Sequence, residues 1–482
     1  MKIAQLFKNI KIQNQSKDFG NIDINGLEID SRKIKTNFGF LAIKGSTQDG
    51  HQFIDKAIEN GAGVVVHEQE LTTFNKEVLY IKVECVQKIA GIVAHKFYDC
   101  PSTKLILVGV TGTNGKTTCA TLMYQLFKGL GFTCGLISTV ENRIDNEVII
   151  ATHTTPDPIQ LNSLLHDMVN KGCSHVFMEC SSHAIDQDRI AGLIFKLAVF
   201  TNLTQDHLDY HKNFEAYFLA KKKFFDDLNN DAIVITNSDD AYGLKIVEDT
   251  KGKIFTYGTN AVATFQLTVN ENNLSGLSIF IQNHLFNSSL IGSFNAYNLN
   301  AVIAVALCLG IDVKQIQQIV PELLGAKGRF EYFIGKEGKL GIVDYAHTPD
   351  ALEKLLSNIN EFKKDNQELW VVFGCGGNRD KSKRPLMLAA VEKYAQYIVV
   401  TSDNPRHEEP QAIINDIINS ATKPNIKILV DRLQAIEFAV DHAKPNAIIV
   451  VAGKGHEAYQ EIAGVKHDFD DLKILAHFLK NN

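Results

Sequence analysis

The sequence has no long apolar run, no signal-like leader and no surplus of basic residues. None of its apolar stretches approaches the ~20 residues that a membrane-spanning helix needs. Its opening segment, MKIAQLFKNIKIQNQ, lacks the apolar centre of a secretory signal. A net charge of −6 argues against a nucleic-acid backbone as the main partner, because phosphate binding normally requires a basic excess. We therefore expect a cytoplasmic protein with no membrane insertion and no nucleic-acid partner.

The eight cysteines are scattered, and no two of them form a CxxC pair. This spacing argues against a metal cluster and against a disulfide framework, and it is typical of a reducing compartment. The chain has 482 residues, which is too long for a single hydrophobic core, so about two to four domains are expected.

Short apolar runs alternate with segments of helical periodicity along most of the chain, a pattern typical of βα units and mainly parallel sheets. We predict an α/β protein with three domains, at residues 1–98, 99–332 and 333–482, the last of them doubly wound and Rossmann-like. The predicted strands are 38–43, 63–66, 79–83, 104–110, 175–179, 197–203, 232–237, 341–344, 369–374, 397–402, 427–430 and 447–453. Helices are predicted at 50–60 and 295–309, and hairpin-like alternation at 264–291.

The segment GVTGTNGKTT (109–118) follows a buried strand and precedes an amphipathic helix. This order presents backbone N–H groups and a helix N-terminus to phosphates, with Lys116 for the outer phosphates and the Thr117 hydroxyl for Mg²⁺. The strict P-loop spacing would place glycine at Val110, whereas Gly109 comes one residue earlier. An ordinary glycine-containing βα turn is the alternative, but a lysine and two threonines directly after the last glycine argue against it.

Further motifs follow in order along the chain and resemble those of the Mur ligases, which build the peptide stem of bacterial cell-wall precursors. They are MECSSHAIDQDRI (178–190), TNLTQDHLDYH (201–211), AYFLAK (216–221), NAYN (295–298), GRFE (328–331), VDYAHTPD (343–350), FGCGGNRDKSKRPLM (373–387), DNPR (403–406) and AGKGHE (452–457). IDSRKI (29–34) and GSTQDGHQFI (45–54) are similar to a uridine-binding amino-terminal domain of the family. The similarity covers all three predicted domains.

The resemblance implies a UDP-binding domain, a central ATPase domain and a Rossmann-like domain that binds an amino acid. It implies an ATP-dependent, ADP-forming ligase of peptidoglycan synthesis, active as a monomer. Its expected reaction forms an acyl phosphate on the D-glutamate γ-carboxylate of UDP-N-acetylmuramoyl-L-alanyl-D-glutamate (UDP-MurNAc-L-Ala-D-Glu), which the amine of meso-diaminopimelate then attacks. The same step with L-lysine is the alternative.

For the metal, the resemblance implies Mg²⁺ ligands at Thr117, Glu179 and His207, and a carbamate formed from CO₂ on Lys221. An ammonium would repel Mg²⁺, whereas a carbamate supplies an anionic oxygen. The alternative for Lys221 is a solvated face, because three lysines are consecutive at 221–223. The expected catalytic residues are Lys116, Glu179, His207 and Lys221.

The resemblance also implies three groups of binding residues. Expected ATP contacts are Gly112, Thr113, Asn114, Gly115, Lys116, Thr117, Thr118, Asn298 at adenine, Arg329 at the phosphates, and Asp344 with His347 at the ribose. Expected contacts to the UDP-linked substrate are Ile29, Ser31, Ser46, Thr47, Gln48, Thr154, Thr155, Ser181, Gln187 and Arg189. Expected diaminopimelate contacts are Arg379, Asp403, Asn404, Pro405, Arg406, Gly453 and Glu457.

Arg406 would select the amino acid, because its planar fork can hold the distal carboxylate that lysine lacks. Taken alone, DNPR could be a turn, since Asn-Pro favours turns. A folylpolyglutamate synthetase or the ligase that adds D-Ala-D-Ala would share the loop, but the amino-terminal DSR block together with DNPR argues against both. A nucleotide-dependent switch without chemistry would be free to lose Glu179, His207 or Lys221, and all three are present.

Overall fold

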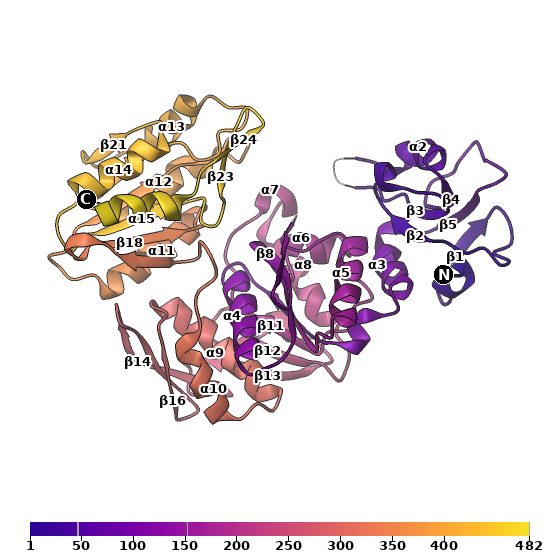
Figure 1. Cartoon of the computed structure of the whole chain (residues 1–482), viewed down its shortest axis with the longest axis horizontal. Coiled ribbons are helices and arrows are strands. Elements are labelled where there is room, and N and C mark those ends of the chain that lie inside the picture. Colours follow the sequence, from indigo (N-terminus) through magenta and orange to yellow (C-terminus); the bar gives the residue numbers. More distant parts are fainter. Residues whose placement is uncertain (46–47, 152, 482) are drawn as a thin grey trace.

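A computed structural model describes residues 1–45, 48–151 and 153–481. Helices and strands form three α/β units in chain order, and the central unit lies between the other two (Figure 1). The predicted fold class and the mainly parallel sheets are confirmed. Within the described part of the chain, no helix combines the length and apolar character needed to cross a membrane.

The amino-terminal unit contains a five-stranded sheet in the order β1-β5-β4-β3-β2, in which only β1 runs antiparallel to its neighbour. Its strands are β1 (Ile12–Gln15), β2 (Gly26–Glu28), β3 (Phe38–Leu41), β4 (Ala62–His67) and β5 (Leu79–Val83). Its helices are α1 (Ile3–Leu6), η1 (Ser31–Lys33), η2 (Gly50–Phe53), α2 (Ile54–Glu59) and α3 (Val86–Phe97).

Helix α3 joins this unit to the central one by an unusually close backbone contact. A Cβ on Gly91, in the middle of α3, would lie 2.4 Å from the carbonyl oxygen of Ala191. Next to it, a Cβ on Gly192 (φ +83°) would lie 3.0 Å from the Cα of Ile92. Glycine inside a helix costs about 1 kcal/mol relative to alanine, so its presence here is explained by the close approach of helix and loop.

The central unit contains an eleven-stranded sheet in the order β16-β15-β14-β13-β12-β11-β6-β10-β7-β8-β9. The strands from β14 to β7 are parallel, and an antiparallel hairpin closes each edge. The strands are β6 (Ile106–Thr111), β7 (Cys134–Ile137), β8 (Glu141–Ile144), β9 (Glu147–Ile150), β10 (His175–Glu179), β11 (Leu197–Phe200), β12 (Ile233–Asn237), β13 (Lys253–Gly258), β14 (Phe265–Asn273), β15 (Gly276–Ile281) and β16 (His284–Ser288). The helices are η3 (Pro101–Lys104), α4 (Lys116–Gly129), α5 (Pro158–Asn170), α6 (Ser182–Asp186), α7 (Leu208–His211), α8 (Phe214–Asp226), η4 (Lys245–Val247), α9 (Ser293–Cys308), α10 (Val313–Ile319) and η5 (Val320–Glu322).

Helices cover both faces of this sheet, and β6 lies in its interior between β10 and β11. Helices α4 and α9 build one core, and α5 and α8 build the other. On β6, a Cβ on Gly109 would lie 2.6 Å from the ring of Phe224, so the absent side chain lets α8 approach the strand closely. The loop after β6 therefore emerges at the carboxyl edge of the parallel sheet, where ligands of open α/β sheets bind.

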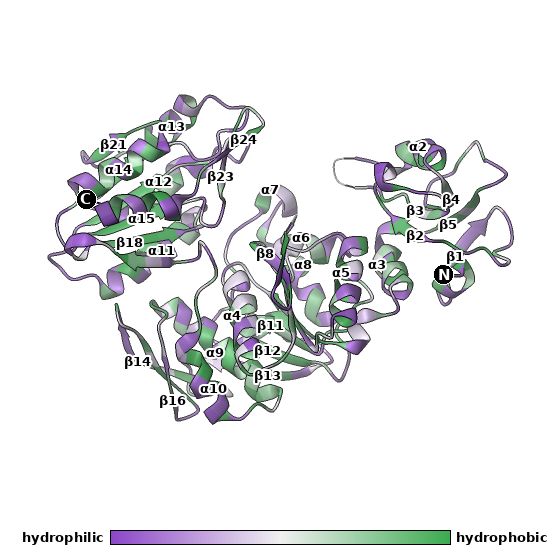
Figure 2. Cartoon of the chain, viewed as in Figure 1, coloured by the Kyte–Doolittle hydropathy of each residue, from purple (hydrophilic) through white to green (hydrophobic). Residues whose placement is uncertain are grey.

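The carboxyl-terminal unit contains a six-stranded sheet in the order β17-β18-β22-β19-β20-β21, parallel except for β17, and a separate hairpin β23-β24. The strands are β17 (Glu331–Ile334), β18 (Leu340–Asp344), β19 (Leu369–Phe373), β20 (Tyr397–Val400), β21 (Ile426–Ile428), β22 (Ile448–Ala452), β23 (Tyr459–Ile462) and β24 (Val465–Asp468). The helices are η6 (Lys336–Gly338), α11 (Pro349–Phe362), α12 (Lys383–Tyr394), α13 (Pro410–Ile418), α14 (Arg432–His442) and α15 (Asp471–Asn481). Figure 2 shows hydrophobic residues concentrated along the sheet strands, while the outer helices alternate between hydrophobic and hydrophilic faces.

Candidate functional site

A cavity of about 990 Å³ lies where the central and carboxyl-terminal units meet. The nucleotide loop after β6, the ends of β10 and β11, and the carboxyl edge of the β18-β22-β19-β20 sheet all contribute to its wall. The two parallel sheets therefore present their carboxyl edges to one common space.

The conformation of the nucleotide loop depends on two glycines at positions that leave no room for a side chain. Gly112 has φ +150°, and a Cβ there would lie 1.9 Å from the Thr201 hydroxyl oxygen. Gly115 has φ +87°, and its Cβ would lie 2.7 Å from the amide oxygen of Asn298. Lys116 begins α4 and donates to the carbonyl oxygens of Gly112 and Thr113, both at 2.9 Å. The loop thus leaves backbone N–H groups and a helix N-terminus facing the cavity.

Lys221 lies at the back of the same loop. Its side chain is 1% exposed, and its Nζ donates to the Gly112 carbonyl oxygen at 2.8 Å. Burial, with the neighbouring Lys116 cation, lowers the pKa of the Lys221 ammonium well below its usual range. The next two lysines differ, because Lys222 pairs with Asp226 and Asp249, and Lys223 pairs with Asp188. Of the three, Lys221 alone lines the cavity.

Glu179 ends β10, directly beside β6, with Val110 as its partner in register. Its side chain is 1% exposed. Its carboxylate accepts from the backbone N–H of Thr139 at 2.7 Å and from the Thr139 hydroxyl at 3.2 Å. These two donors fix the carboxylate at the cavity wall, where it faces the nucleotide loop.

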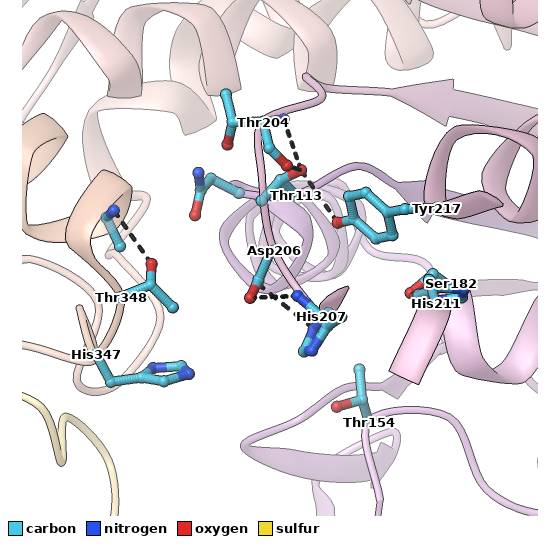
Figure 3. Close-up of polar contacts among 12 residues, drawn as sticks. Thr113, Thr154, Ser182, Thr204, Asp206, His207, His211, Tyr217, His347 and Thr348 are labelled. Atoms are coloured by element: carbon cyan, nitrogen blue, oxygen red, sulfur yellow. Dashed lines mark hydrogen bonds and ion pairs between the residues drawn. The ribbon is translucent and has the colours of Figure 1, made fainter. Parts of the chain in front are cut away.

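His207 precedes α7 in a left-handed backbone conformation with φ 53°. Its Nε2 lies 3.5 Å from a carboxylate oxygen of Asp206 (Figure 3). Its ring is 4.9 Å from that of His183. Burial lowers the pKa of the His207 imidazole to about 4, so the ring is uncharged near neutral pH and has a lone pair to offer.

Among the described residues, no three His, Cys, Asp or Glu side chains cluster closely enough to hold a metal ion by themselves. Mg²⁺ is normally bound by one or two carboxylates together with substrate phosphates rather than by an all-protein cage. Thr117 and Glu179 border the nucleotide loop with oxygen donors, and His207 and Lys221 lie beside it. This donor set fits Mg²⁺ that arrives with a nucleotide.

The expected adenosine contacts surround the loop. Asn298 of α9 is buried and donates to Asn295 at 3.2 Å. The guanidinium carbon of Arg329 lies 4.5 Å from the centre of the Tyr345 ring, and its Nε is buried without a hydrogen-bond partner among the described residues. Asp344 ends β18 and accepts from two backbone N–H groups, each at 2.7 Å, and burial raises the pKa of its carboxyl. His347 also lines the cavity.

A second wall carries four of the residues expected to contact the UDP-linked substrate, and Gln187 lies behind it without lining the cavity. Arg189 donates to the Thr155 carbonyl oxygen at 2.9 Å and makes two hydrogen bonds to Gln187. Thr155 in turn donates to the Glu179 carbonyl oxygen at 2.8 Å. Thr154 and Ser181 line the cavity as well. This wall is therefore connected directly to the strand that ends at Glu179.

The amino-terminal unit does not contribute to the cavity through its expected residues. Ile29, Ser31 and Gln48 lie elsewhere, at or near η1 and the loop before η2. Ser31 is 6% exposed, and its carbonyl oxygen accepts from Asn60, which gives it a structural partner. Ser46 and Thr47 lie outside the described residues.

The third wall comes from the carboxyl-terminal unit and carries Arg379, Asp403, Asn404, Arg406, Gly453 and Glu457. Pro405 does not line it. Arg406 Nη1 donates to the Gly377 carbonyl oxygen at 2.8 Å, and its Nε lies 3.6 Å from Glu461. At Gly453 (φ +118°), a Cβ would lie 2.6 Å from a carboxylate oxygen of Asp403.

Two residues at or behind the cavity wall were missed from the sequence, Lys454 behind it and Asp206 on it. Lys454 is fully buried, and its Nζ lies 3.2 Å from the Glu457 carboxylate and 3.0 Å from the Asn404 amide oxygen. The Glu457 carboxylate, which is expected to contact diaminopimelate, therefore already has a cation beside it. The sequence feature that could have identified Lys454 is its position inside the motif AGKGHE. Asp206, directly before His207 in QDHLDYH, also lines the cavity.

Family models match most of the chain. A model described as Mur ligase family, catalytic domain, matches residues 23–97; Mur ligase middle domain matches 110–306; and Mur ligase, glutamate ligase domain matches 328–455. A protein of Phocaeicola vulgatus named UDP-N-acetylmuramoyl-L-alanyl-D-glutamate–2,6-diaminopimelate ligase is 46% identical over 100% of both chains. One of the same name from Cytophaga hutchinsonii is 47% identical over 95% of each.

A solved structure titled as the same ligase superposes with a TM-score of 0.71 at 33% identity. The match covers 99% of this chain and 98% of that one. The similarity therefore extends through all three units, in sequence as well as in fold.

Proposed function

The chain belongs to the Mur ligase family, and from this premise we propose the reaction that it catalyses. It is an ATP-dependent, ADP-forming ligase that adds diaminopimelate to the D-glutamate γ-carboxylate of UDP-MurNAc-L-Ala-D-Glu, a step of peptidoglycan synthesis. The observation that carries this proposal is the single cavity in which the nucleotide loop, the Thr155–Arg189 wall and the Arg406 wall meet. A ligase of three substrates needs such a common space.

In the first step, a γ-carboxylate oxygen attacks the γ-phosphorus of ATP, an O–P bond forms, and ADP leaves. Two anions must approach each other, so cations near the nucleotide loop lower the barrier. Lys116 releases the loop carbonyls and turns to the phosphates, whose negative charge favours its ammonium form. Mg²⁺, when bound, supplies Lewis-acid polarisation of the phosphoryl group, and Thr117, Glu179 and His207 would hold it.

Lys221 has the properties of a carbamylation site. Its amine is buried and burial lowers its pKa well below the usual range, which favours the neutral form whose nitrogen lone pair can attack CO₂, forming an N–C bond and releasing a proton. The resulting carbamate places an anionic oxygen next to the nucleotide loop. The loss of the hydrogen bond from Lys221 to Gly112 accompanies this change.

In the second step, the amine of diaminopimelate attacks the acyl carbonyl carbon, the C–O bond to phosphate breaks, and the amine loses a proton as the amide forms. We propose that Arg406 binds the distal carboxylate with the part of its guanidinium that faces the cavity, and that Glu457 pairs with the distal ammonium. L-Lysine lacks that carboxylate and would leave Arg406 facing an apolar chain. Ser31 and the loop at 46–48 would bind the uridine diphosphate, outside the cavity.

The direct test incubates the purified protein with UDP-MurNAc-L-Ala-D-Glu, ATP and Mg²⁺, and adds either meso-diaminopimelate or L-lysine. We expect a tripeptide product of the diaminopimelate mass, with one ADP released per amide, and far slower turnover with lysine. No product, or a product only with lysine, would refute the proposal. Because ATP and the UDP-linked precursor are cytoplasmic metabolites, we place the reaction there, and we expect a monomer by light scattering.

A further inference from the structure

Helix α11 carries a stripe of polar side chains that faces the central unit. Asp350, Lys354, Asn358 and Glu361 follow one another at intervals of one helical turn, and each makes a contact to a residue of the central unit. The other face of α11 is apolar, with Leu352, Leu355, Leu356 and Ile359 in the core of the carboxyl-terminal unit. The stripe is therefore an interdomain surface, and its residues are defined by helical periodicity.

One end of the stripe lies near the chain connection between the two units. Asn358 accepts from the Ser293 hydroxyl at 2.6 Å and from the backbone N–H of Phe294 at 3.3 Å. The Phe294 ring lies 5.2 Å from that of Phe330, close to the start of β17. This end therefore combines polar contacts with an apolar ring contact.

The other end of the stripe reaches the nucleotide loop. One carboxylate oxygen of Asp350 accepts from the Thr204 hydroxyl at 2.7 Å and from the Asn114 side-chain amide at 3.3 Å. Lys354, one turn later, lies 3.1 Å from the same carboxylate and 3.4 Å from the Thr204 hydroxyl. Asn114 belongs to the loop itself, so the carboxyl-terminal unit contacts the ATP-binding segment through one acidic side chain.

Thr204 connects this contact to the rest of the site. Its backbone N–H donates to the Thr113 hydroxyl at 2.9 Å, and that hydroxyl lies 3.1 Å from the Tyr217 hydroxyl (Figure 3). Tyr217 is one turn before Lys221 on α8, and the Lys221 Nζ lies 4.8 Å from the centre of its ring. A shift of Asp350 would therefore disturb the loop and the elements behind it together.

We propose that Asp350 is a positioning residue that docks the carboxyl-terminal unit on the nucleotide loop. The docked arrangement brings the wall with Arg406 to the acyl carbon formed beside Lys116. This inference rests on the proposed function for its kinetic readout, and on the interdomain geometry alone for its structural readout. Asp350 lies outside the predicted set of site residues and touches neither the reacting groups nor the metal donors.

The test compares Asp350→Ala, Asp350→Asn and the control Glu353→Ala in the full chain. Glu353 lies on the same helix, but its partner Lys393 belongs to the same unit, so its loss removes a carboxylate without touching the interface. Asp350→Ala should raise the KM for diaminopimelate and lower kcat, with a combined loss of roughly tenfold to a hundredfold in kcat/KM. Asp350→Asn keeps an oxygen that accepts from Thr204, so it should stay within about threefold of the parent.

Thermal unfolding checks that all variants remain folded, and the KM for the UDP-linked substrate should not change. Small-angle scattering of the ligand-free protein supplies the readout without turnover: Asp350→Ala should increase the radius of gyration, whereas Glu353→Ala should not. Unchanged scattering and kinetics in Asp350→Ala, or equal losses in the Ala and Asn variants, would overturn the inference. If the parent chain makes no product, the proposed function fails, and the scattering comparison alone decides the role of Asp350.

Discussion

Replacing Arg406 by alanine should separate recognition of the amino acid from every other step. Arg406 has a side chain that is 24% exposed, and it is held by the Gly377 carbonyl oxygen and by Glu461. The distal carboxylate of diaminopimelate would add a charge-assisted pair to this partly desolvated guanidinium. Losing such a pair should cost about 2–4 kcal/mol, which corresponds to roughly a thirtyfold to thousandfold fall in kcat/KM for diaminopimelate.

Steady-state kinetics with diaminopimelate and L-lysine measures this effect, with the KM for ATP and for the UDP-linked substrate as internal references. Both references should stay near the parent values, because Arg406 lies on the wall away from the nucleotide loop. Arg406→Lys is the matched variant: it keeps the charge but not the fork, so its loss should be intermediate. Equal losses on diaminopimelate and lysine would show that Arg406 only supports the loops around Gly377 and Glu461, and would refute its role in selecting the substrate.

Three further predictions concern the nucleotide loop and acid stability. Lys221→Ala should lower kcat roughly a hundredfold or more, with partial recovery when short-chain carboxylates are added, as followed by ADP release. Gly112→Ala places a Cβ 1.9 Å from Thr201 and should weaken ATP binding roughly tenfold or more in calorimetry, while the protein stays folded. Glu408→Gln should destabilise the fold by about 1–2 kcal/mol at neutral pH, because Arg384 pairs with Glu408 and holds the pKa of its carboxyl at about 2. The folded state binds fewer protons there than the unfolded state, so this stabilisation is complete above the ordinary pKa of 4.5 and is lost as the pH falls towards about 2.

The first two of these have a matched control variant in the chain, and the third has a control in its pH dependence. Lys223→Ala removes a lysine of the same helix that lies outside the cavity, and equal losses in both variants would contradict the carbamate role. Gly131→Ala introduces a methyl at another positive φ, +90°, with nothing within 4 Å, so a similar loss of ATP affinity would rule out the proposed steric cause. For Glu408→Gln, urea unfolding at several pH values measures the loss in free energy of unfolding. A loss that stays the same between neutral and acid pH would contradict the predicted pH dependence.

The fold was largely predictable because its main signals are local. The runs 79–83 and 175–179 are strands with the predicted bounds. The alternation at 264–291 corresponds to the three antiparallel strands β14, β15 and β16. The glycine that comes one residue before the strict P-loop position is explained only by the structure. Gly109 is not part of the phosphate-binding turn but lies inside β6, where Phe224 of α8 leaves no room for a side chain.

The site was predictable only as far as motifs name single residues. The motif AYFLAK singles out Lys221 among the consecutive lysines at 221–223. The structure adds the physical difference, because of the three only Lys221 donates to the Gly112 carbonyl oxygen and lines the cavity. The pairing of Lys454 with Glu457 and the contact of Asp350 with Thr204 were not predicted. Lys454 and Glu457 are only three residues apart in AGKGHE, so their opposite charges could have been noticed in the sequence. The contact of Asp350 with Thr204 depends on how distant parts of the chain meet, and neither periodicity nor composition carries that information.

The contact between Gly91 and Ala191 has a consequence for which substrates the enzyme accepts. Because helix and loop touch through their backbones, the amino-terminal unit cannot tilt towards or away from the catalytic cavity without breaking that contact. If the amino-terminal unit binds the uridine diphosphate as proposed, this contact fixes the distance from that end of the substrate to the carboxylate that receives phosphate. We then expect a precursor one amino acid shorter to bind through its nucleotide end without reaching Lys116, so that it would occupy the enzyme without being extended.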